Sequence, residues 1–173
     1  RQLVFPTSNV EKAGNVIAAH ESRQAAIDAA ERAAASILIR LDPGDERTTA
    51  FLFGDDVCCP HPAFAAAGEA IRAAVSRLPR FIGMPPGSGT TGPVPILALP
   101  GIDDEAARDW HGLTMAEAVS LLVDRGLIRL LDAPATSGFA LGSVFWRAFL
   151  RGSAQGGAWV VDSLARGPEV LHR

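Results

Sequence analysis

The sequence predicts an α/β or α+β chain in two parts: a hairpin–helix piece at residues 1–41 and a second small mixed α/β unit at residues 42–173. Short apolar runs of strand type alternate with alanine-rich stretches that have helical spacing. An Asp-Pro-Gly-Asp turn at 42–45 separates the two parts. The chain has 173 residues, of which 48% are apolar and 20% charged, so it can bury a core without disulfide bonds.

The first part begins with two short apolar runs, at residues 3–5 and 15–19, which predict a β-hairpin. Ser22 then caps a helix by accepting a hydrogen bond from a free N–H of the first turn. The apolar positions of this helix recur three and four residues apart, which predicts one apolar face. We expect that face to pack closely on a sheet, because its side chains are small. Its members are Ala26, Ile27, Ala30, Ala33, Ala34 and Ile37.

The second part predicts further helices and strands around a loop rich in proline and glycine. Thr114 and Glu117 have the spacing of a capping box, which marks the start of a helix. We expect the tryptophans to be core residues. In chain order, the predicted elements are a strand at 48–53, a helix at 62–78, the loop at 84–95, a strand at 96–99, a short acidic helix at 103–110, a helix from 114 to about 126, a strand at 127–131, a core or partner-facing helix at 143–150 and a strand at 159–161.

The loop contains a formal G-x-G-x-x-G pattern, whose backbone N–H groups could approach a phosphate. The possible phosphate-binding residues are Gly87, Ser88, Gly89 and Gly92. Prolines on both sides exclude the strand and the helix that normally flank a dinucleotide-binding turn. The context therefore favours a flexible loop, and a lid that closes over a ligand stays an alternative.

Two adjacent cysteines, Cys58 and Cys59, precede His61, and this set of thiols and imidazole would suit zinc. A closed zinc site needs a second pair of ligands, which the remaining histidines do not supply. We therefore interpret the segment as a strand end and a turn, with the thiols packed as small apolar groups. A nucleophilic Cys59 activated by His61 is the alternative. His111, beside Trp110, is interpreted as a structural residue.

The net charge of −3 and the lack of a basic cluster argue against nucleic acid as a partner. No apolar run is long enough for a membrane span, and no secretory signal is recognisable. Neighbouring cysteines cannot join distant segments and favour a reducing compartment. We therefore expect a cytoplasmic protein without a membrane partner.

Residues 3–41 resemble the C-terminal end of the ATP-grasp fold of carboxylate–amine ligases. The resemblance lies in Lys12-Ala13-Gly14-Asn15-Val16-Ile17-Ala18, of the type "G-x-V-I-A", followed by the polar helix start His20-Glu21-Ser22-Arg23-Gln24-Ala25-Ala26-Ile27. It implies a ligase that joins a small-molecule carboxylate to an amine through an acyl phosphate, with ATP and Mg²⁺ as cofactors and a homo-oligomer as a possible assembly.

In that family the lysines that hold the nucleotide and the magnesium motif precede the segment matched here. The resemblance therefore implies that this chain is the C-terminal portion of such a ligase, inactive alone and binding neither ATP nor Mg²⁺ by itself. Arg1 and Lys12 are the cations nearest to where the family keeps its active site, and no catalytic residue is transferred. The alternative is a self-contained small-molecule-binding or protein-interaction domain without ATP chemistry.

Overall fold

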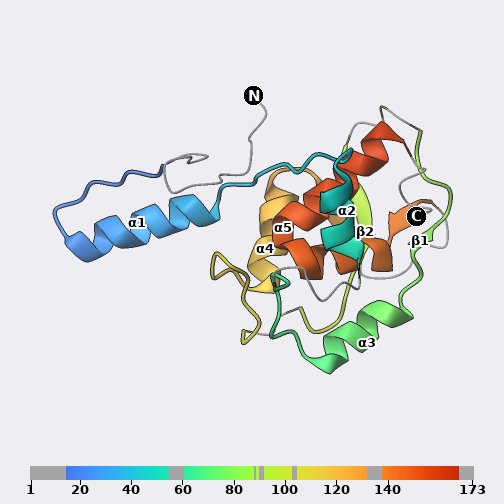
Figure 1. Cartoon of the computed structure of the whole chain (residues 1–173), viewed down its shortest axis with the longest axis horizontal. Helices are drawn as coiled ribbons and strands as arrows, with labels where there is room; N and C mark the ends of the chain where they lie inside the picture. The colour runs from blue at the N-terminus through green and yellow to red at the C-terminus, as the bar shows by residue number, and fades with distance from the viewer. Residues whose placement is uncertain are drawn as a thin grey trace. The chain divides into compact units, whose positions relative to one another are not determined.

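The computed structural model describes residues 15–54, 61–87, 89, 92–102, 105–131 and 138–167. The chain divides into two compact units, Arg1–Ile37 and Leu38–Arg173, so the division falls before the boundary predicted after residue 41. The described residues form five helices and one four-stranded mixed sheet (Figure 1). The mixed α/β class predicted from the sequence is confirmed.

The first unit contains helix α1, Arg23–Ala35, whose N-cap is the predicted Ser22: its side chain accepts a hydrogen bond from the N–H of Ala25. The predicted strand at 15–19 is wrong. These residues are irregular, and Ile17 is 92% exposed. Strand propensity alone does not fix an extended segment when no neighbouring strand is paired with it. The predicted first strand, at 3–5, lies outside the described residues. Helix α1 buries no residue, so the expected packing of its alanine face on a sheet is also wrong.

The second unit holds the sheet, and its strands run in the order β1-β4-β2-β3. Strand β1 is antiparallel to β4, whereas β2 is parallel to both β4 and β3. Helix α4 connects the parallel strands β2 and β3, which makes a β–α–β unit. The strands are β1 (Phe81–Ile82), β2 (Val94–Leu97), β3 (Ile128–Leu131) and β4 (Ala140–Leu141), and the helices are α2 (Glu46–Phe53), α3 (Glu69–Arg77), α4 (Met115–Asp124) and α5 (Ser143–Arg166).

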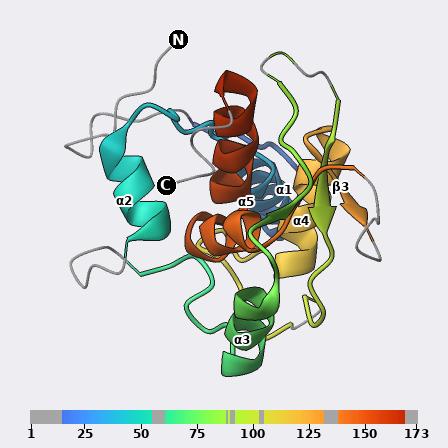
Figure 2. The same ribbon diagram turned by 90° about the vertical axis from the view of Figure 1, so that its right-hand side faces the viewer.

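Helix α5 is the centre of this unit. Figure 2 shows it between α2 on one side and α4 with the strands on the other, and α2, α3 and α4 all pack on it. Its aromatic residues are among the largest buried side chains, with Trp146 and Trp159 at 0% and 1% exposure. The Trp146 indole N–H donates to the carbonyl of Leu97, 2.8 Å away, and so ties the helix to β2. None of the described helices has the length and apolarity needed to cross a membrane.

Helix α5 is kinked at Ser153, where the backbone leaves the helical region with φ 52° and ψ −146°. Figure 2 shows the two halves running in different directions. The carbonyls of Leu150 and Arg151, at the end of the first half, accept hydrogen bonds from the N–H groups of Phe64 and Ala63. The kink therefore does not leave these carbonyls unsatisfied.

Three predicted elements in this unit are wrong. Residues 48–53 form a helix, because the Asp45 carboxylate caps the first turn by accepting from the N–H of Arg47, and this local bond outweighs the strand propensity of the threonines. Residues 159–161 lie inside α5, where burial against the core determines the structure. In the region of the acidic helix predicted at 103–110, the described residues 105–110 are not helical. Arg108 forms an isolated antiparallel β-bridge with Thr114 instead.

Other predictions hold in part or in full. The capping box of Thr114 and Glu117 is present and begins α4. The predicted strands at 96–99 and 127–131 correspond to β2 and β3, and the core helix at 143–150 is the first half of α5. The helix predicted from residue 62 begins only at Glu69, after a turn. Trp110, expected in the core, is 52% exposed.

Candidate functional site

A small pocket lies beside β1, at the point where the end of α2 meets the start of α5. Its volume is about 160 Å³, and it is lined by Phe53, Arg80, Ser143, Val144 and Arg147. The lining residues comprise two arginines and a serine together with a phenylalanine and a valine. Such a mixture of convergent polar groups and apolar walls is typical of small-molecule sites.

The pocket is built by a close approach of two main-chain segments. The carbonyl of Pro79 accepts from the N–H of Ser143 at 2.8 Å, and the carbonyl of Arg80 accepts from the N–H of Gly142 at 2.9 Å. A Cβ on Gly142 would lie 2.1 Å from the Pro79 oxygen, so only glycine permits this approach. These bonds hold Arg80 beside the first turn of α5.

The helix supplies the other polar groups of the pocket. Ser143 and Arg147 are four residues apart in α5, so their side chains share one face of the helix. Within the described ranges, Arg147 forms no ion pair. Its guanidinium is charged at any physiological pH, as is that of Arg80. The pocket can therefore hold a carboxylate or another oxyanion.

The glycines of the possible phosphate loop lie elsewhere on the second unit. Gly87, Gly89 and Gly92 are exposed, and a Cβ on any of them would meet no atom within 4 Å. Gly89 and Gly92 have left-handed backbones, with φ of 92° and 124°. The segment leads into strand β2 and not into a helix, so it lacks the following helix of a dinucleotide-binding turn. Ser88 lies outside the described residues, and whether the loop binds phosphate stays a prediction.

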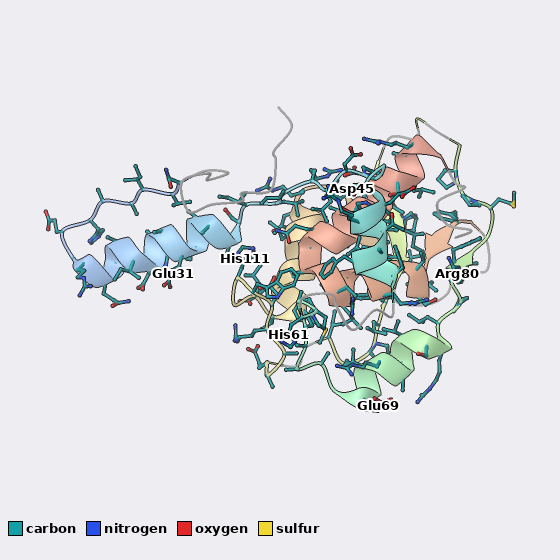
Figure 3. All side chains as sticks on the ribbon, viewed as in Figure 1. Glu31, Asp45, His61, Glu69, Arg80 and His111 are labelled. Atoms are coloured by element: carbon teal, nitrogen blue, oxygen red, sulfur yellow. The ribbon has the colours of Figure 1, made fainter. Side chains whose placement is uncertain are left out.

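The remaining candidates are not brought together in the described residues. Arg1, Lys12, Cys58 and Cys59 lie outside them. His61 is exposed, and Figure 3 shows it well away from Arg80. In the described part of the chain, no three His, Cys, Asp or Glu side chains are grouped so that they could hold a metal ion.

Sequence reasoning missed the pocket residues Arg80, Ser143 and Arg147. A signal was present in the stretch 143–150, where Arg147 interrupts an otherwise apolar helix four residues after a serine. Arg80 could not be found in this way, because it reaches the pocket through the pairing of β1 with β4.

Two carboxyl groups have shifted pKa values, and both are explained by local structure outside the pocket. The N–H of Gly44 holds the pKa of Asp42 below its usual value, helped by the charge of Arg166. The N–H of Thr114 does the same for the pKa of Glu117, helped by the Thr114 hydroxyl and the charge of Arg108. Neither group signals acid–base chemistry at the pocket.

Comparison of the chain with protein-family models, with curated proteins and with solved structures finds no match.

Proposed function

We propose that the second unit is a small-molecule-binding domain whose pocket takes a small carboxylate between Arg80 and Arg147. The observation that carries this proposal is that two guanidinium groups and the Ser143 hydroxyl line one hollow. Guanidinium groups bind carboxylates through paired, charge-assisted hydrogen bonds. Phe53 and Val144 offer apolar contact to the body of the same ligand.

The size of the pocket limits the ligand. Pockets for drug-sized molecules are on the order of 300–1,000 Å³, whereas this one is about 160 Å³. A short mono- or dicarboxylate suits it, and a whole nucleotide does not. The two positive charges favour a ligand with two acidic groups.

Thermal unfolding with added succinate, citrate or benzoate tests this proposal. A ligand that binds only the folded chain raises the unfolding temperature as its concentration increases. We expect such a rise for the wild type and its loss in Arg147→Gln and in Arg80→Gln. The matched control is Arg129→Gln, an exposed arginine on β3 at the opposite edge of the sheet, which should keep the full response. A response that survives both pocket substitutions would contradict the proposal.

A carboxylate pocket would also suit the C-terminal portion of an ATP-dependent carboxylate–amine ligase. This second proposal rests on the pattern at 3–41, whose expected strand at 15–19 is not formed. ATP and Mg²⁺ would then be held by residues upstream of this chain. We therefore expect the isolated chain to bind Mg-ATP only weakly, and a dissociation constant near ~1 μM in calorimetry, about −8 kcal/mol, would contradict that expectation.

A further inference from the structure

The kink of α5 places a serine in a backbone conformation that serine rarely adopts. Ser153 has φ 52° and ψ −146° and is the one described non-glycine residue with a positive φ. A backbone of this kind costs about 1–3 kcal/mol and persists only where the surroundings hold it. Such strained residues are concentrated at functional sites, which makes the surroundings of the Ser153 hydroxyl a candidate site.

The Ser153 hydroxyl faces a buried carboxylate. Its Oγ donates to Oδ2 of Asp109 at 2.6 Å, and the two residues are 2% and 8% exposed. The other oxygen of Asp109, Oδ1, accepts from the N–H groups of His111 at 2.8 Å and Leu113 at 2.9 Å. The main chain of the 109–113 turn therefore fixes the carboxylate and directs Oδ2 at the serine.

The residues after Ser153 return to a helix, which runs to Arg166. In known acyl-transfer enzymes, a nucleophilic serine at a strained turn opens a helix, and N–H groups near the start of that helix stabilise the negative charge. Gly156 makes the turn possible: a Cβ there would lie 2.1 Å from the carbonyl oxygen of Ala148. A nucleophile held by a base, with the base held in turn by a third group, is the arrangement that acyl transfer requires.

Arg151 lies two residues before the kink residue, and its side chain is only partly bonded. Its Nε donates to the Phe51 carbonyl at 3.0 Å, whereas its buried Nη2 has no hydrogen-bond partner among the residues that the structure describes. The Arg151 guanidinium lies over the Phe51 ring, and that ring contacts Trp110, the neighbour of Asp109. Through Phe51 and the half-exposed Trp110, the Arg151 side chain is therefore connected to the 109–113 turn.

We propose that Ser153 and Asp109 form a nucleophile–base pair that hydrolyses an ester of a small carboxylic acid. Ser153 Oγ attacks the ester carbonyl carbon while its proton passes to Asp109 Oδ2. The C–O bond to the alcohol breaks, and the alcohol leaves with that proton. Water then attacks the acyl-serine, giving one proton to Asp109; the carboxylic acid departs as the proton returns to Oγ. This activity is independent of the arginine pocket.

The test is covalent labelling of the whole chain with a fluorophosphonate probe, followed by mass spectrometry of the modified peptide. The probe reaches a pair this deeply buried only when the 109–113 turn opens, so we expect slow labelling, at Ser153. Hydrolysis of p-nitrophenyl acetate is the second readout. Ser153→Gly suits the backbone, because glycine tolerates a positive φ, and it should abolish both signals.

Asp109→Asn keeps a side-chain oxygen as an acceptor for the turn but removes the base, and it should slow labelling by about 10²-fold or more. Circular dichroism and the unfolding midpoint show whether each variant is folded. The matched control is Ser163→Ala, another buried serine of α5, whose hydroxyl has no hydrogen-bond partner. It should label like the wild type. A folded wild type that is not labelled at Ser153, or equal labelling in Asp109→Asn, would overturn the proposal and leave the pair as a structural pin of the kink.

Discussion

At the scale of single residues, the pocket depends on a glycine, Gly142, because this position has no room for a side chain. Gly142 lies where the 79–80 segment crosses the start of α5, and its N–H donates to the carbonyl of Arg80. Any Cβ at this position would meet the oxygen of Pro79 at 2.1 Å, which is backbone and cannot turn aside. A larger residue must separate the two segments, which moves Arg80 away from Ser143 and Arg147.

Gly142→Ala should therefore destabilise the protein by about 1–3 kcal/mol, the usual cost of forcing extra atoms into a packed site. Urea unfolding measures the change in midpoint. The matched control is Gly87→Ala, where an added Cβ meets nothing within 4 Å and the backbone is not left-handed. The control should stay within about 0.5 kcal/mol of the wild type. Equal destabilisation by both substitutions would show that the contact with Pro79 is not what matters.

Sequence reasoning found local residue roles and missed those that depend on tertiary contacts. Ser22 and the pair Thr114 and Glu117 were predicted as caps, because a cap is a contact between residues two or three apart. The kink at Ser153 was not predicted, although the sequence has glycines on both sides of it, at 152, 156 and 157. Ser153 forms a hydrogen bond there to Asp109, 44 residues earlier in the chain, and no local pattern encodes such a contact.

At the scale of the element, helices were better predicted than strands. The backbone hydrogen bonds of a helix join residues four apart in the sequence. The spacing of the apolar residues and the capping residue therefore identify α1 and α4 from the sequence alone. A strand takes its bonds from neighbours, and here β1 and β4 have only two residues each, too short for any pattern. Residues 48–53 have strand propensity but form a helix because Asp45 caps its first turn. Residues 159–161 are helical because they are buried against the core as part of α5.

Helix α4 gives a pH-dependent test at this scale. The N–H of Thr114 donates to Oε2 of Glu117 at 2.7 Å and lowers the pKa of this carboxyl below the usual 4.5. The stabilisation by the carboxylate is therefore fully present above the unfolded-state pKa and is lost as the pH falls through the lower folded-state value. Glu117→Gln keeps a neutral hydrogen-bonding group but removes this titration.

We expect Glu117→Gln to lose less stability than the wild type between neutral pH and pH 3, measured by urea unfolding across that range. The control is Glu69→Gln, in the first turn of α3, where the cap has no side-chain hydrogen bond. Its stability should follow the wild-type pH curve. An unchanged acid dependence in Glu117→Gln would mean that the capping carboxylate does not contribute to stability.

At the scale of the whole molecule, the buried core that the described residues form lies in the second unit. The buried apolar cluster begins at Leu52, and the first partly buried side chains packed on it are those of Leu38 and Leu41. The segment 38–42 is fastened to α5 as well: the indole N–H of Trp159 donates to the Asp42 carbonyl, and Arg40 pairs with Asp162. The sequence places residues 38–41 in the first part because the Asp-Pro-Gly-Asp turn at 42–45 is the stop signal that follows the helix.

Two truncations test the division after Ile37. A chain that begins at Leu38 keeps every core contact, and since α1 buries no residue, its unfolding free energy should equal that of the full chain within about 0.5 kcal/mol. A chain that begins at Asp45 loses two packed leucines, the acceptor of Trp159, and the partners of Asp162 and Arg166. Loss of partly buried leucines costs on the order of 1–3 kcal/mol even before the polar contacts are counted.

Chemical denaturation of both chains, followed by tryptophan fluorescence, compares their unfolding free energies. If the chain from Leu38 unfolds as early as the chain from Asp45, residues before Leu38 contribute to the core and the division at Ile37 is wrong.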